Sequence, residues 1–390
     1  MQRKLLVAAV AAALAAPAVA LAQSSVTISG QLKGGMQNVK FSGAAAGARP
    51  GHSSEWRFTD EASRIGFDMR EDLGGGLTAV GSYQIKPTLD GNIGVDPAGI
   101  YSSGGENFIG LQSSSWGLLR IGSVTRHITI SSDSFAATAP VLALSPYTGK
   151  VMVAGAAASS AVAGATRTRN QIGWDSPNWS GFTLSTGWST RQAGGLEGDL
   201  TAPTFGKLRK GNAWWFTPRY GADNWFVGAS YLSDKQEPAA TTATTLKGWR
   251  LAGRYSMSGF SVGLTYDRTK MSRDTATAAG ITTAEINNRT AYDIPLEYTT
   301  GPHTAGILYS RAKADKMIAN SASRAWALRY AYALSKRTTL VAGYSTVRNN
   351  AGAIYGLSGD DTTGVTGSTN ALPTAGEDVR AYGVGMKHTF

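Results

Sequence analysis

Cysteine is absent from this chain of 390 residues. No disulfide framework, thiolate nucleophile or cysteine-ligated metal is therefore available to it. Histidine is scarce, with four scattered residues, and the sequence contains no His-Glu-x-x-His or Gly-Lys-Ser/Thr motif. We therefore expect no enzyme activity and no metal or organic cofactor.

Long apolar runs are confined to the amino terminus. Residues 1–22 begin with Arg3 and Lys4, continue as an apolar or small stretch and end in a small-x-small pattern. This pattern predicts a secretory signal peptide and an exported mature chain, residues 23–390, with a retained membrane anchor as the alternative. No later run reaches about 18 apolar residues, which argues against a helical inner-membrane protein.

Charge and proline are also low. Charged residues make up 16% of the chain, and 48 glycines stand against 13 prolines. This balance favours many short strands over packed helices. Without Arg3 and Lys4, the remaining 35 basic residues exceed the 26 acidic ones by nine. Such a positive balance supports an anionic partner only loosely, because charges on exposed loops are screened over roughly 8 Å.

Strict alternation of side chains recurs along the chain. In the last eleven residues one parity holds Tyr382, Val384, Met386 and Phe390, and the other holds Ala381, Gly383, Gly385 and Lys387. The same period of two appears over residues 26–39, 63–70, 77–86, 182–189 and 325–334, and it indicates strands rather than helices. Each strand would have an apolar face and a face of small or polar residues. A soluble sheet is the alternative for any one segment.

The connections between these strands come in two lengths. Short turns rich in Gly, Pro, Asn or Ser lie at 71–76, 113–117, 176–181, 221–224, 256–259, 300–303 and 335–337. Longer polar or small-residue loops lie at 40–54, 87–105, 127–166, 191–211, 235–247, 272–285, 316–321 and 349–376. Seven turns and eight loops that alternate define sixteen strands.

This layout predicts an all-β fold, a transmembrane antiparallel β-barrel of 16 strands with short periplasmic turns and long external loops. Closure removes the unpaired edges that an open sheet of this size would expose. A barrel this wide cannot be filled by its own side chains, so we expect a water-filled lumen. Residues 23–390 would form one domain.

Several motifs resemble those of the Gram-negative general porins, and more closely those of beta-proteobacteria. They are Ser25-Val-Thr-Ile-Ser-Gly30, Ser63-Arg-Ile-Gly-Phe67, Arg70-Glu-Asp-Leu-Gly-Gly-Gly-Leu77, Asn170-Gln-Ile-Gly-Trp-Asp-Ser-Pro177, Leu334-Ser-Lys-Arg-Thr338 and Gly385-Met-Lys-His-Thr-Phe390. They span nearly the whole mature chain in the family's order.

The resemblance implies a homotrimer in the outer membrane through which small hydrophilic solutes diffuse. It also implies a third loop that folds inward to narrow the pore, and a closing strand whose terminal Phe390 is read by the barrel assembly machinery. Expected partners are outer-membrane lipid and lipopolysaccharide, and small anionic or neutral solutes. No nucleic-acid partner is expected.

The third loop, residues 127–166, is poor in acids. Its one carboxylate is Asp133, and His127 and Lys150 are its basic residues. In the family this loop usually brings carboxylates opposite basic wall residues. An acid-poor loop facing arginines would favour anions, because selectivity follows the charges at the narrowest ring.

The basic wall candidates come from parity and from the resemblance. Arg64 matches a family position that resembles a constriction arginine, and Arg70 and Lys33 lie on the inward parity of their strands. Further candidates are Arg120, Arg126, Arg167 and Arg169. Ser123 stands where the family usually has an arginine after glycine, so Arg120 or Arg126 would compensate. Any of these arginines could instead pair with a wall carboxylate such as Asp68.

Two functional alternatives stay open from the sequence. The channel could be specific for one anionic solute rather than general. Its external loops could also bind a host ligand or a phage.

Overall fold

Seventeen strands form one antiparallel sheet in the computed structural model. The structure describes residues 24–43, 54–60, 63–85, 87, 89, 105–125, 132, 167–190, 211–239, 242–277, 280–357 and 373–390. The strands are β1 (Ser25–Ser42), β2 (Glu55–Asp60), β3 (Arg64–Gly74), β4 (Leu77–Ile85), β5 (Asn107–Ser113), β6 (Gly117–Thr125), β7 (Arg167–Asp175), β8 (Phe182–Ser189), β9 (Asn212–Ala222), β10 (Trp225–Ala239), β11 (Thr242–Met257), β12 (Phe260–Thr277), β13 (Gly280–Thr300), β14 (His303–Ala312), β15 (Ser323–Ala333), β16 (Thr338–Asn349) and β17 (Asp378–Thr389). Among the described residues, no helix has the length and apolar character needed to cross a membrane.

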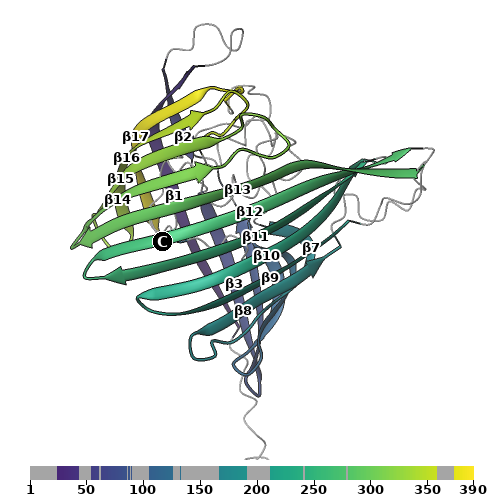
Figure 1. Cartoon of the computed structure of the whole chain (residues 1–390). Helices are drawn as coiled ribbons and strands as arrows, with labels where there is room; N and C mark the ends of the chain where they lie inside the picture. The colour runs from purple at the N-terminus through teal and green to yellow at the C-terminus, as the bar shows by residue number, and fades with distance from the viewer. Residues whose placement is uncertain are drawn as a thin grey trace, which may run out of the picture.

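The strands pair in chain order around a closed ring (Figure 1). Each strand from β3 to β16 pairs with the next, and β17 pairs with β1. β3 pairs with the first half of β1 and β2 with its second half, so β2 and β3 share one position. The barrel therefore has sixteen positions, and the predicted sixteen-stranded antiparallel barrel is confirmed.

The division between β2 and β3 was not evident in the sequence. Ser63 lies at this break, fully buried, and its Oγ accepts a hydrogen bond from the Lys33 backbone N–H at 3.0 Å. The same hydroxyl lies 3.3 Å from the Lys33 carbonyl, to which it can donate. The Ser63 side chain thus takes the place of a backbone hydrogen-bond partner for Lys33 and fixes the start of β3 against β1.

The barrel closes at its carboxy-terminal residue. The backbone N–H of Phe390 donates to the Gly30 carbonyl at 3.1 Å, and the Gly30 N–H donates back at 3.1 Å. The Phe390 ring fills the space beside Gly30, where a Cβ would lie 2.4 Å from a ring carbon. The last strand therefore pairs with β1 and closes the barrel.

The short turns fall where the sequence predicts them. At the β11–β12 turn, Ser258 and Gly259 have φ angles of 50° and 85°. Two consecutive positive φ values are typical of the two-residue hairpin turn that matches strand twist. A Cβ on Gly259 would also lie 2.5 Å from the Thr299 carbonyl oxygen, so glycine is required twice over.

Two of the predicted long loops are instead paired strands. The β10–β11 ladder continues to Ala239 and Thr242, through the interval 235–247, and the β12–β13 ladder continues to Thr277 and Gly280, through 272–285. Figure 1 shows the β12–β13 hairpin projecting beyond the other strands. The sequence prediction was wrong here because these extensions leave the lipid and lose their apolar alternation. Their threonines still favour an extended backbone.

The outward face is apolar and ringed by aromatic side chains. Exposed outward residues include Ile109, Val227, Leu264 and Val384. Aromatic pairs lie near the short turns, as in Trp179–Phe182, Tyr220–Trp225 and Phe260–Tyr298. A second set lies nearer the loop ends: Trp214–Tyr231, Trp249–Tyr266 and Tyr309–Trp326. Two aromatic girdles around an apolar band are the outer surface of a membrane-spanning barrel.

Candidate functional site

The inner wall is lined by small and polar side chains. On β15 the exposed Trp326, Leu328 and Tyr330 alternate with buried inward residues, among them Ala327 and Arg329. The same parity on the other strands turns glycine, alanine, serine, threonine and charged residues inward. The candidate site is therefore the lumen, and its charged side chains form several groups.

The first group is a basic cluster at the barrel seam. Lys33 of β1 and Lys387 of β17 are direct partners in the β1–β17 register, and Arg64 of β3 is the partner of Gln31, two residues from Lys33. Arg64 is close enough to Lys387 for their charges to repel each other. These three basic residues come from three adjacent positions of the inner wall.

Arg64 and Arg70 have no carboxylate partner within the described residues. Arg70 lies nearer the short turns, is exposed, and donates through Nη1 to the Gln112 amide oxygen at 3.0 Å. Asp68 lies on the same face, but its Oδ2 accepts from the Ser29 hydroxyl at 3.4 Å. The inward parity predicted for both arginines is present in β3.

Arg120 is on the inner wall but is neutralised by two acids. Its Nη2 donates to Asp175 Oδ2, and its Nη1 lies 3.6 Å from Glu106 Oε1. The Ser185 hydroxyl donates to the other Asp175 oxygen at 2.6 Å, and the Arg120 guanidinium lies over the Phe108 ring. Arg120 therefore pairs with carboxylates of the wall, which is the alternative that the sequence left open.

The other predicted candidates cannot be placed by their side chains. Arg126 and Asp133 lie outside the described residues. Arg167 and Arg169 are in β7, but their side chains also lie outside what the structure describes. Their place at the constriction stays a prediction.

Two more inward arginines form buried ion pairs that the sequence did not reveal. Arg250 of β11 donates through Nε and Nη2 to Asp267 Oδ2 of β12 at 3.0 and 2.9 Å. Arg329 of β15 lies 3.8 Å from Glu297 of β13. Parity places each of these residues inward, but only the strand register shows which acid faces which arginine.

A third pair of arginines flanks an aromatic ring. Arg219 of β9 and Arg254 of β11 lie 4.5 and 5.8 Å from the ring centroid of Phe226, which faces inward from the intervening β10. Neither has a carboxylate partner among the described residues. Stacking on a ring holds a guanidinium in place while its N–H groups stay available to an anion.

One described residue of the predicted third loop lies against the opposite wall. The Ser132 N–H donates to Thr265 Oγ1 of β12 at 2.9 Å, and the two hydroxyls are also 2.9 Å apart. Gly263 makes room for this contact, since a Cβ there would lie 2.5 Å from the Ser132 Cβ. Because Thr265 faces inward, Ser132 lies inside the barrel, whereas β7 and β6 are five and six positions away from β12 around the ring.

A closed, sixteen-position barrel with an apolar outside, two aromatic girdles and a charged inner wall defines a membrane channel. The chain belongs to the Gram-negative porin family, whose model matches residues 8–352. It forms an outer-membrane channel for passive diffusion of ions and small hydrophilic solutes. A search of curated proteins gives no match.

Solved porin structures share this fold. An anion-selective porin from Comamonas acidovorans is 20% identical, with 94% of this chain and 100% of that chain covered and a TM-score of 0.71. OmpF of Salmonella typhi, in complex with daunomycin, is 15% identical over 94% and 97% of the two chains, with a TM-score of 0.61. OmpT of Vibrio cholerae in its trimer form is 12% identical over 94% and 99%, with a TM-score of 0.59.

Proposed function

We propose that this porin prefers anions. The observation that carries this proposal is the division among the inward arginines. Arg120, Arg250 and Arg329 are paired with acids, whereas Arg64, Arg70, Arg219 and Arg254 have no carboxylate partner within the described residues. These four arginines therefore present positive charge to a permeating ion, and ion selectivity follows such charges.

Two further observations support this preference. The sequence of the predicted third loop has one carboxylate, Asp133, that could offset the positive charge of the basic wall. The Comamonas acidovorans porin of similar fold is described as anion-selective. The preference would be general rather than specific for one solute, because the cations are spread over several strands.

The assembly proposed with this function is an exported homotrimer. Residues 1–22 have the pattern of a cleaved signal peptide, and OmpT of similar fold is described in a trimer form. Outer-membrane lipid and lipopolysaccharide would contact the aromatic girdles. The assembly machinery would read Phe390 at the closing strand.

The test is the reversal potential of the purified full-length protein in a planar bilayer across a KCl gradient. We expect the sign given by a chloride permeability above that of potassium. A reversal potential of the opposite sign would show that the unpaired arginines do not set selectivity. A current that saturates with the concentration of one particular anion would overturn the proposal that the pore is general rather than specific for one solute.

A further inference from the structure

The segment that follows β16 folds back into the mouth of the barrel. Residues 350–357, which we call the inner strap, were expected as the start of an external loop. In the structure Ala353, Tyr355 and Leu357 are buried, and Tyr355 is 1% exposed. They belong to one cluster with Val39, Ala291, Ala312, Ala325, Val347, Val379 and Ala381.

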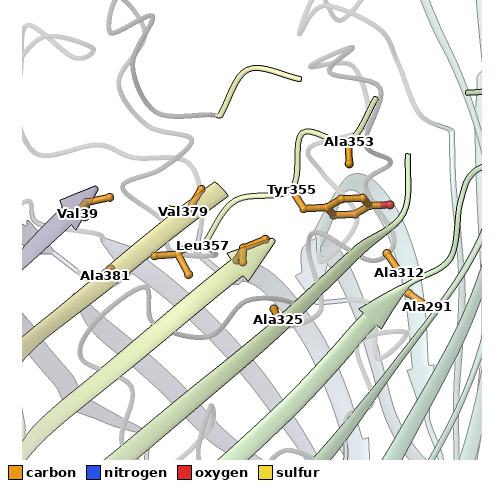
Figure 2. Packing of buried hydrophobic residues seen from close by; sticks show 10 residues of the cluster. Val39, Ala291, Ala312, Ala325, Ala353, Tyr355, Leu357, Val379 and Ala381 are labelled. Carbon is orange, nitrogen blue, oxygen red and sulfur yellow. The ribbon is translucent and has the colours of Figure 1, made fainter. Parts of the chain in front are cut away.

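The strap lies on the inner side of the wall. Ala325 and Ala381 in this cluster are inward, since their strand neighbours Trp326 and Tyr382 are each 48% exposed on the outer face. Figure 2 shows the Tyr355 ring with Ala353 on one side and Ala312 and Ala291 on the other. Alanines at this level leave the space that the ring and the Leu357 side chain fill.

The covered wall spans six adjacent positions. Ala291 pairs with Ala312, Ala325 with Val347, and Val39 with Ala381 in the ladders from β13 round to β1. These residues lie near the loop ends of their strands. The strap therefore covers one side of the external mouth, well above the turns at the other end.

Hydrogen bonds also hold the strap in place. The Asn349 amide nitrogen donates to the carbonyls of Tyr355 at 2.8 Å and Glu377 at 2.7 Å, and its oxygen accepts from the Tyr355 N–H at 3.3 Å. The Gly376 N–H donates to the Ala353 carbonyl at 2.9 Å. Asn349 thus ties the strap to the chain that returns into β17.

Tyr355 also contacts a charged residue of the wall. Arg289 of β13 is 2% exposed, and its Nη1 donates to the Tyr355 hydroxyl at 3.2 Å. The Tyr355 side chain therefore places its ring in an apolar cluster and its hydroxyl on a guanidinium. A buried tyrosine whose ring is packed and whose hydroxyl is hydrogen-bonded holds a defined position.

We propose that the inner strap is a second narrowing of this channel, with Tyr355 as the residue that sets its position. It lies at the external mouth and is apolar, so it restricts the size of a solute and the conductance rather than the sign of the permeating ion. Among the described residues, its contacts include β1 and β13–β17. Bulky neutral solutes are the class it excludes.

The test compares Tyr355→Ala with Tyr344→Ala in the full-length protein. Tyr344 is on β16 and 41% exposed on the outer face, so the same chemical change there should leave the channel unaltered. For Tyr355→Ala we expect higher single-channel conductance and faster swelling of proteoliposomes in larger sugars. The reversal potential should keep its sign, which separates this result from a failure of the anion proposal.

Unchanged conductance and sugar exclusion in a correctly folded Tyr355→Ala protein would overturn the proposal. If Tyr355→Ala fails to fold, a variant with a single cysteine tests the proposal instead. Because the chain has no cysteine, Ala353→Cys gives one labelling site. We expect it to be protected from a maleimide in the otherwise unchanged protein, and rapid labelling would show that the strap does not occupy the mouth.

Discussion

Arg64 and Arg250 are both arginines on the inner wall, yet their surroundings give them different roles. Arg250 is buried and shares Asp267 through two hydrogen bonds, and Thr269 supplies a third bond to that carboxylate at 2.9 Å. Arg64 faces Lys33 and Lys387 instead. A neutralised pair exerts little field on a passing ion, whereas a group of like charges raises the local potential.

The comparison separates wall stability from ion selection. The paired arginines link different strands of the wall, and their charges are neutralised by acids. The unpaired arginines can attract anions because none of them forms an ion pair with a carboxylate of the described residues. The alternation of side chains along a strand places paired and unpaired arginines alike on the inner wall. The sequence alone therefore does not show which arginines stabilise the wall and which attract ions.

The largest expected effect comes from breaking a buried pair. Arg250→Ala leaves Asp267 buried without its counter-charge, which should lower the free energy of unfolding by about 3–5 kcal/mol. Arg64→Ala removes no such partner and should change it by less than about 0.5 kcal/mol. Guanidinium unfolding of the refolded barrel, followed by tryptophan fluorescence, measures both.

The double variant Arg250→Ala with Asp267→Ala is the control for that experiment. Removing both charges should recover much of the lost stability, since no buried charge is left unpaired. Equal unfolding midpoints for Arg250→Ala and Arg64→Ala would mean that the two arginines do not differ as described.

The second effect should appear in selectivity. Arg64→Glu places a negative charge beside Lys33 and Lys387, and we expect the anion preference to fall strongly or invert. Lys336→Glu, in the exposed turn between β15 and β16, makes the same change of two charge units away from the lumen and should alter the reversal potential far less. Equal shifts would place the selective ring elsewhere.

Much of the fold could be predicted because lipid and water impose alternation on every spanning strand. Strands such as β15 and turns such as Ser258–Gly259 follow from that rule and from turn chemistry. The rule does not apply beyond the membrane. For this reason the sequence pattern predicts loops at the β10–β11 and β12–β13 extensions, and it predicts an external loop at the inner strap.

The site was less predictable than the fold. The sequence places Arg64, Arg120 and Lys33 on inward parity, but Asp175 lies 55 residues from Arg120 along the chain. Lys387 was recognised on the polar parity of the last strand without being proposed for the site. Its pairing with Lys33 depends on closure of the barrel, which joins residues from the two ends of the sequence.

A smaller change in selectivity should follow from the arginines on Phe226. Arg219→Gln and Arg254→Gln each remove one positive charge without adding a negative one. We expect each to lower the anion preference less than Arg64→Glu, and the double variant to lower it further. The same KCl gradient measures the series. No change in the double variant would mean that these cations lie too far from the permeation path.

The smallest effect we expect concerns the contact between Ser132 and the wall. Gly263→Val would place a side chain where Ser132 lies, since even a Cβ there comes within 2.5 Å of the Ser132 Cβ. Loss of the two bonds to Thr265 should increase fluctuations of the open-channel current while leaving the reversal potential nearly unchanged. Gly248→Val on β11 is the control, because a Cβ there has no neighbour closer than 3.7 Å. If the two variants give equal fluctuations of the open-channel current, the contact between Ser132 and Thr265 does not stabilise the open channel. The ion selectivity that distinguishes Arg64 from Arg250 would then not depend on this contact.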